Sequence, residues 1–161
     1  MRKIKNPWIH VEGYNCFGCC EKNPIGLRMQ FYEDGDEIIS FWNPQDHYQS
    51  WVSTMHGGIL STLVDELAGW VVFRKLQTTG MTTTLEVHFK HPVLTSETQL
   101  IIRGHIREQH HHVVFIDVTI ENSHGETCVE SSVVYYVFDK ERAKEMGFNG
   151  CEVEDEQFLS M

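Results

Sequence analysis

Long apolar runs are missing from this sequence of 161 residues. No run approaches the roughly 18 consecutive apolar residues that a membrane-spanning helix needs. The opening stretch "MRKIKNPWIHVEG" carries basic residues but has no apolar core of the kind found in secretory signals. We therefore expect a cytoplasmic protein that has no membrane partner.

Positive charge is also scarce. The chain has 13 Lys and Arg residues against 23 Asp and Glu residues, which gives a formal net charge of -10. A net charge this negative does not provide the positively charged surface that binds nucleic acid, so we expect no nucleic-acid partner. The five cysteines are odd in number and do not form the disulfide framework of a secreted domain, which favours a reducing compartment.

Hydrophobic periodicity divides the chain into elements. Residues 27–33 and 36–42 alternate around an Asp-Gly turn, which predicts a β-hairpin. From residue 57 to about residue 77, apolar residues recur at helical spacing with no proline among them, which predicts one long helix. Runs rich in β-branched and aromatic residues follow and predict four strands, at 82–92, 97–108, 111–121 and 126–138.

The order of these elements is two strands, one helix and four strands, with no repeat and no linker. It predicts an α+β fold in which one curved antiparallel sheet wraps a central helix that is buried on most sides. We expect a single domain over residues 1–161. A short polar helix is expected at 139–146 and a mobile acidic tail at 152–156.

The predicted helix breaks two local rules. It begins with Gly57 and Gly58, each of which costs a helix interior about 1 kcal/mol relative to alanine. It also carries two adjacent acids, Asp65 and Glu66, in a stretch that is apolar nearly all round. Departures of this kind are typical of functional sites.

Three stretches of the sequence resemble the hotdog-fold acyl-CoA thioesterase family. They are "CFGCCEKNPIGLRM", "HGGILSTLVDELAGW" and "TTTLEVHFKHPV". The likeness is to the branch, similar to phenylacetyl-CoA thioesterases, in which the helix opens with His-Gly-Gly and carries an acid seven residues after the second glycine. It covers about residues 14–138 and leaves 139–161 as a C-terminal extension. The resemblance implies a hotdog fold, hydrolysis of a thioester that is usually of coenzyme A, no metal, no organic cofactor, and sites at a dimer interface.

The helix N-terminus suits the chemistry of thioester hydrolysis. The reaction places negative charge on the carbonyl oxygen, and a helix N-terminus offers unpaired N–H groups and the positive end of the helix dipole. We therefore expect the Gly57 N–H to be the oxyanion donor, Gly58 to make room for the acyl group, and His56 to order the turn or add a hydrogen bond. Tight packing of the helix on the sheet is the alternative reason for the two glycines.

Asp65 is the candidate general base for water, or the nucleophile that forms an anhydride; the sequence leaves both open. It lies seven residues after Gly58, about 10 Å along the helix axis, which is too far for one carbonyl to touch both. A homodimer or homotetramer with shared sites would bring a second helix N-terminus alongside. A buried acid bonded to backbone is the alternative reading, and Glu66 points about 100° away.

Other residues are candidates for holding the substrate. Thr82 and Thr83 begin the strand after the helix, and Thr82 could hold the water or the carboxylate. Gln49 and Ser50 fall where members of the family present a loop that helps to hold the thioester, although Ser50 stands where relatives commonly have glycine. We expect an acyl-CoA as the small-molecule partner.

Metal sites find little support in the sequence. Cys16, Cys19 and Cys20 give one C-x2-C, half of a zinc site, and no second pair follows. The histidines at 110–112 open a strand, and we expect them to be a solvated strand end. No metal is therefore expected. The tryptophans at 42, 51 and 70 are expected in the core.

Three function classes follow from these observations. An acyl-CoA thioesterase leads. A non-catalytic acyl-CoA sensor would use the same pocket, but a carboxylate at Asp65 gives it no advantage near a polyanionic ligand. A hotdog-fold hydratase needs an Asp and His pair at a spacing that the sequence lacks.

Overall fold

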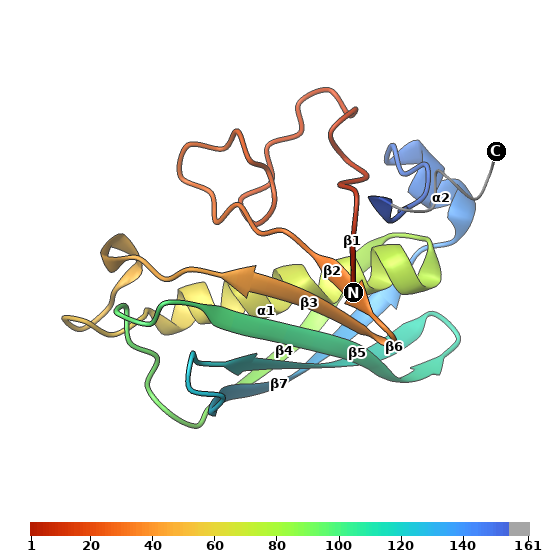
Figure 1. Ribbon diagram of the computed structural model, residues 1–161. Coiled ribbons are helices and arrows are strands. Elements are labelled where there is room, and N and C mark those ends of the chain that lie inside the picture. Colours follow the sequence, from red (N-terminus) through yellow and green to blue (C-terminus); the bar gives the residue numbers. More distant parts are fainter. Residues whose placement is uncertain (155–161) are drawn as a thin grey trace.

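The computed structural model of the protein describes residues 1–154. One seven-stranded antiparallel sheet curves around a central helix, α1 (Gly57–Val71), as Figure 1 shows. The strand order is β1-β2-β3-β5-β6-β7-β4. The chain therefore has the predicted α+β architecture, that of a hotdog fold.

The strands have the following bounds. The predicted hairpin consists of β2 (Tyr32–Asp34) and β3 (Glu37–Trp42), which pair around the turn at Gly35. β1 (Arg2–Lys3) adds a short edge beside β2. The four later strands are confirmed with small shifts of their ends: β4 (Gly80–Phe89), β5 (Leu100–His110), β6 (Val113–Glu121) and β7 (Thr127–Val137).

Helix α1 packs on the sheet through an apolar face. Leu63, Val64, Leu67 and Ala68 are fully buried, and strands β3 to β7 all contact the helix. The helix continues as a π-type turn, η2 (Val72–Leu76), and ends at Gln77, whose φ of 53° reverses the chain. This end agrees with the predicted boundary. The chain then crosses to β4, the sheet edge farthest from β1.

The first half of the predicted hairpin is mostly not a strand. Residues 27–31 alternate between buried and exposed, as a strand would, but Arg28 has a φ of 55°, which interrupts an extended conformation. The backbone N–H groups of Leu27 and Met29 donate to carbonyls of Phe17 and Gly18 instead of to a strand. Residues 4–31 thus form a long loop segment that lies over α1 (Figure 1).

Two further expectations are corrected. Trp42 and Trp70 are buried as predicted, but Trp51 is 82% exposed because residues 50–54 form a tight loop bonded to itself, with Trp51 and Val52 at its tip. The acidic tail is not loose at residues 152–154, because Val153 is fully buried and bridges Ile4. Residues 155 and 156 lie outside the described residues.

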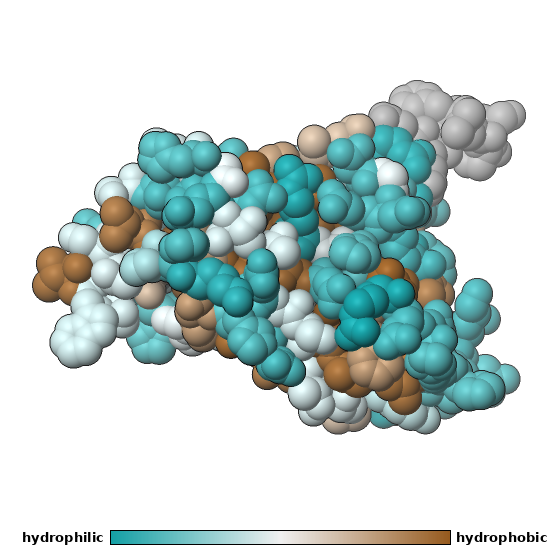
Figure 2. All heavy atoms as spheres, turned by 90° about the horizontal axis from the view of Figure 1, so that it is seen from below, coloured by the Kyte–Doolittle hydropathy of each residue, from teal (hydrophilic) through white to brown (hydrophobic). Residues whose placement is uncertain are grey.

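Two short elements and the surface remain to be described. The short helix α2 (Lys140–Glu145) is confirmed, and the Asp139 side chain caps it by accepting from the Arg142 N–H. The 310 turn η1 (Asp46–Tyr48) precedes the loop that leads to α1. The face seen in Figure 2 is largely hydrophilic, with hydrophobic patches between the polar groups. Within residues 1–154, no helix combines the length and hydropathy needed to cross a membrane.

Candidate active site

Asp65 and Thr82 form the centre of the candidate site. Asp65 lies in the middle of α1, and Thr82 lies on the neighbouring edge strand β4. The Thr82 hydroxyl donates a hydrogen bond of 2.6 Å to Asp65 Oδ1. A bond this short is typical of a donor to a carboxylate, and it fixes the rotamer of the acid. The acid is thus bonded to a side-chain hydroxyl, and only part of its surface is accessible.

A β-bulge in β4 aims Thr82 at the helix. The pairing of β4 with β7 shifts register between Thr82 and Thr84, so Thr83 is the extra residue. The Thr83 hydroxyl donates to the Val134 carbonyl on β7, 3.1 Å away. The structure therefore brings Thr82, but not Thr83, to the Asp65 carboxylate.

Tyr135 is a neighbour of the site that no motif in the sequence indicates. It is largely buried on β7 and lies opposite Thr82 in the strand register. Burial raises the pKa of its hydroxyl, and the nearby charges of Asp65 and Glu66 raise it further, so the phenol stays protonated at neutral pH. Strand alternation in "VVYYVF" could have assigned one of the two tyrosines to the interior, but not its place beside Asp65.

The N-terminus of α1 is built by His56 and the two glycines. His56 is the N-cap residue, and its Nδ1 accepts a hydrogen bond of 2.8 Å from the Gly58 N–H. A Cβ added to Gly58 would lie 2.9 Å from that nitrogen, so glycine leaves room for the cap. Within residues 1–154, no group accepts a hydrogen bond from the Gly57 N–H. One N–H of the helix start is therefore available to an external acceptor.

Gln49 and Ser50, the predicted substrate-holding residues, lie in the loop before α1. The Gln49 side-chain oxygen accepts from the Ser53 N–H, and the Ser50 N–H donates to the Thr54 carbonyl. Both residues close the loop whose tip carries Trp51 and Val52. This loop leads directly into His56, whose N–H donates to the Tyr48 carbonyl. Gln49 and Ser50 thus shape the approach to the helix start.

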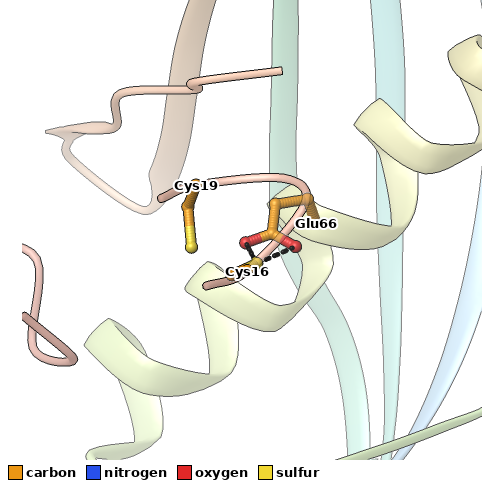
Figure 3. A group of neighbouring side chains, drawn as sticks. All are labelled: Cys16, Cys19 and Glu66. Carbon is orange, nitrogen blue, oxygen red and sulfur yellow. Dashed lines mark hydrogen bonds between the residues drawn. The ribbon is translucent and has the colours of Figure 1, made fainter. Parts of the chain in front are cut away.

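Glu66 points to the other side of α1. Its Oε1 and Oε2 lie 3.5 and 3.6 Å from the Cys16 sulfur, and its Oε1 accepts from the Trp70 indole N–H at 3.1 Å. Figure 3 shows Cys16, Cys19 and Glu66 gathered where the N-terminal loop crosses the helix. The two adjacent acids of α1 therefore belong to two separate sites.

The thiols beside Glu66 differ in their pKa values. A hydrogen bond from Cys19 lowers the pKa of the Cys16 thiol, and this effect outweighs the opposing effects of burial and of the Glu66 charge. The same bond raises the pKa of the Cys19 thiol, which burial raises further. Tyr14 adds a contact of 2.8 Å between its hydroxyl and the Cys19 sulfur.

The histidines at 110–112 lie at a solvated strand end, as expected. All three histidines are exposed at the β5–β6 turn. Among residues 1–154, the grouping of metal-ligating side chains that lies close enough to share an ion is Cys16, Cys19 and Glu66. Arg103 and Arg107 are each engaged with two acids on the sheet surface.

Comparison with known proteins supports the fold. Residues 53–129, which run from the loop before α1 into β7, match the family model described as the thioesterase superfamily. The resemblance to hotdog-fold thioesterases seen in the sequence is therefore confirmed over this segment of the chain. No curated protein matches the chain.

Solved structures share the fold at low sequence identity. A hypothetical thioesterase protein from Streptococcus pneumoniae, solved with coenzyme A, is 22% identical, with a TM-score of 0.63 over 68% of this chain and 85% of that one. The smu.793 protein from Streptococcus mutans, bound to acetyl CoA, is 17% identical, with a TM-score of 0.66 over 81% and 98%. The PaaI protein of the E. coli phenylacetic acid degradation operon is 15% identical, with a TM-score of 0.64 over 70% and 81%.

Proposed function

We propose that the protein hydrolyses acyl-CoA thioesters to the free acid and coenzyme A. The observation that carries the proposal is the Asp65 carboxylate, held by Thr82 on an otherwise apolar helix whose first N–H, at Gly57, has no acceptor among the described residues. A fixed carboxylate and a free N–H at a helix start are the two groups that thioester hydrolysis requires.

The two groups cannot serve one carbonyl within a single chain. Asp65 lies eight residues after Gly57, which is about 12 Å along the helix axis. The proposal therefore requires a two-fold dimer in which the α1 helices run antiparallel, so that the Asp65 of one protomer approaches the helix start of its partner. Each dimer then has two composite sites. A homotetramer built from two such dimers would keep them.

The edge strand β4 supports a dimer of this kind. It is ten residues long, has no neighbour on its outer side within the described sheet, and exposes the apolar residues Met81, Leu85 and Phe89. A long exposed apolar edge is a surface that proteins normally cover. Phe89 also lies beside Gly57, since a Cβ on that glycine would be 3.4 Å from its ring. Pairing of two β4 edges would therefore bring both helix starts to the interface.

The reaction follows from these positions. Asp65 takes a proton from water while the water oxygen attacks the thioester carbonyl, and the Gly57 N–H stabilises the resulting oxyanion. Collapse of the tetrahedral intermediate breaks the carbon–sulfur bond, and the departing thiolate takes up the proton. The alternative route, attack by the carboxylate itself and hydrolysis of an anhydride, uses the same two groups.

His56, Gly58 and Thr82 support this machinery. His56 binds the Gly58 N–H and so orders the helix start around Gly57. Thr82 holds the carboxylate, while Gln49 and Ser50 shape the loop on the substrate side. We assign Thr83 a backbone-bonding role on β7 beside the site. No metal is required by this chemistry.

Coenzyme A is the proposed thiol carrier. The support is the coenzyme A and the acetyl CoA named for two structures of the same fold. The second candidate, a sensor that binds acyl-CoA without hydrolysis, is disfavoured by the fixed carboxylate, because a negative charge beside a polyanionic ligand weakens binding.

The experiment is a panel of acyl-CoAs of different chain length and aromatic character, with released thiol measured by a colorimetric reagent. Steady release above the spontaneous rate is the expected result. Tight binding without turnover would support the sensor, and hydration of crotonyl-CoA without thiol release would indicate a hydratase.

A further inference from the structure

We propose that Cys16, Cys19 and Glu66 form a zinc site that fastens the N-terminal loop segment to the central helix. The three side chains come from two parts of the chain that are far apart in sequence, and their ligand atoms all lie within 4.8 Å of one another. In Figure 3 the Cys16 sulfur lies against the Glu66 carboxylate, and the Cys19 sulfur lies beside them.

The spacing of the ligand atoms fits tetrahedral zinc. Bond lengths of about 2.3 Å to sulfur and 2.0 Å to oxygen, at a tetrahedral angle, put neighbouring sulfur and oxygen ligands about 3.5 Å apart. The Cys16 sulfur lies 3.5 and 3.6 Å from the two Glu66 oxygens. The same distances are ordinary for a thiol that donates to a carboxylate, and they also match two ligands of one ion.

The chemistry of the ligand set selects the metal. Thiolates favour zinc over magnesium or calcium, and a carboxylate is an accepted third ligand of zinc. Two thiolates and one carboxylate carry three negative charges at most, which a divalent cation offsets to -1. Among the described residues, no Lys, Arg or His forms an ion pair with Glu66, so no protein cation supplies that charge.

Outer hydrogen bonds for two of the ligands are already present. The Tyr14 hydroxyl contacts the Cys19 sulfur at 2.8 Å, and the Trp70 indole N–H donates to Glu66 Oε1 at 3.1 Å. Groups in such positions orient metal ligands and commonly contribute to affinity. Gly18, between the two cysteines, leaves room for the Glu66 carboxylate, because a Cβ there would make the acid shift.

The cluster borders a cavity. Tyr14, Cys19 and Trp70 help to line a cavity of about 530 Å³ between the N-terminal segment and α1. Three protein ligands with one open position leave room for a bound water. The Glu66 side chain points about 100° around α1 from Asp65, so the site is separate from the proposed thioesterase chemistry.

The proposed zinc site accounts for two features of the chain that have no role in the proposed thioester hydrolysis. One is Glu66, an acid in an apolar helix whose partners lie away from Asp65. The other is that residues 4–31, a long segment without helix or strand, are held in one position. Segments of this length inside compact domains need a specific anchor or function. The sequence showed only half of a site, because Glu66 is 47 residues beyond Cys19.

The first test measures metal in the purified, reduced protein. After incubation with Zn²⁺ and gel filtration, elemental analysis should give one zinc per chain. Co²⁺ in its place should give the visible bands of a tetrahedral ion together with a thiolate-to-cobalt charge-transfer band. Absence of bound zinc after reconstitution overturns the proposal, as does recovery of a Cys16–Cys19 disulfide that takes up no zinc once reduced.

Variants then assign the ligands. Cys16→Ser, Cys19→Ser and Glu66→Gln should each weaken zinc binding more than about 100-fold, measured by competition with a chelating dye. Cys20→Ser is the matched control, because Cys20 is adjacent and buried but its thiol donates to the Tyr14 carbonyl. Equal zinc binding by Cys16→Ser and wild type overturns the assignment, and so does an equal loss in the Cys20 control.

Hydrogen exchange tests the fastening role without reference to catalysis. Removal of zinc should speed amide exchange in residues 14–30 while β5 and β6 stay protected. Unchanged exchange in 14–30 would contradict the role of the ion as an anchor. Because neither test uses acyl-CoA, the zinc site and the proposed thioesterase activity can fail independently.

Discussion

Asp65 and Glu66 are adjacent in the chain, yet their carboxylates lie on different sides of α1, one bonded to Thr82 on β4 and the other beside Cys16 in the N-terminal loop. A step of one residue turns a helix by about 100°, so neighbours cannot share a site. The presence of each acid in this apolar helix therefore has its own explanation: Asp65 contacts β4, and Glu66 contacts the N-terminal loop.

Replacement of Asp65 tests the proposed base. Asp65→Asn keeps the shape of the side chain and can still accept from Thr82, but it cannot take a proton. We expect kcat to fall by a factor of about 10² to 10⁴, with substrate binding retained or improved. Glu66→Gln, a change of the same kind one residue away, should lower kcat far less. Wild-type turnover by Asp65→Asn, or a larger loss in Glu66→Gln, would show that the base is wrongly assigned.

Thr82 is expected to act by positioning the carboxylate. Thr82→Val is nearly isosteric and removes the 2.6 Å hydrogen bond. Because a hydrogen bond to a charged group contributes about 1.5–3 kcal/mol, kcat should fall roughly 10- to 100-fold. Thr83→Val is the comparison, since that hydroxyl bonds the Val134 carbonyl. Equal effects of the two substitutions on kcat would contradict a specific role for Thr82.

The candidate site was predictable from the sequence only in part. Helical periodicity and the Gly-Gly start located α1, and helix geometry alone separated Asp65 from Glu66. Tyr135 beside Asp65, and Cys16 beside Glu66, could not be predicted because they depend on how β7 and the N-terminal loop pack against the helix. Contacts between distant segments have no local signal in a single sequence.

The strand predictions have the same limit, because a local pattern does not show which distant segments pair. Alternation predicted the strands well, and it also matched the burial of residues 27–31. It failed there because Arg28 takes a left-handed conformation and the partners of Leu27 and Met29 are loop carbonyls. Trp51 was misplaced because aromatic character does not reveal a loop closed by its own backbone bonds.

Dimerisation through β4 should be sensitive to charge at its exposed edge. Leu85→Glu puts a carboxylate on a side chain that is 38% exposed in the single chain. If two β4 edges pair, like charges would meet across the interface and the dimer should dissociate. Sedimentation should then report monomers, with thioesterase activity lost in parallel. The matched control is Glu108→Gln on exposed β5, which should leave the dimer intact; a fully active monomer of any variant would contradict the shared site.

The buried acid Glu33 should make stability depend on pH. Burial opposes its charge, but hydrogen bonds and ion pairs with Arg74 and Lys75 dominate and lower its pKa from 4.5 to about 2. A pKa that is lower in the folded state adds stability that is complete above pH 4.5 and is lost as the pH falls toward 2. The free energy of unfolding should drop by about 3 kcal/mol over this range from Glu33 alone.

Glu33→Gln should remove that dependence. The variant should be less stable than wild type at pH 7, because Arg74 and Lys75 lose their shared carboxylate, and the difference should shrink near pH 2. Denaturant unfolding at pH 7, 4 and 2.5 measures both curves. Parallel curves for the two proteins would show that Glu33 is not the group responsible.

The last prediction tests whether each site is shared between two chains. Gly57→Pro removes the proposed oxyanion donor with little change to the helix, because proline suits the first helical position. His56 already has φ -65° and ψ 129°, a conformation that a residue before proline favours. Gly57→Pro and Asp65→Asn should each be nearly inactive alone.

Mixing the two inactive variants should restore activity. In a heterodimer, the Asp65 of one chain faces the Gly57 of the other, so one of the two composite sites is intact. Random exchange makes half of the dimers heterodimers, which gives about one quarter of wild-type activity. A mixture of Asp65→Asn with wild type controls for exchange itself. If refolded mixtures of the two inactive variants contain heterodimers but stay inactive, the shared site is refuted.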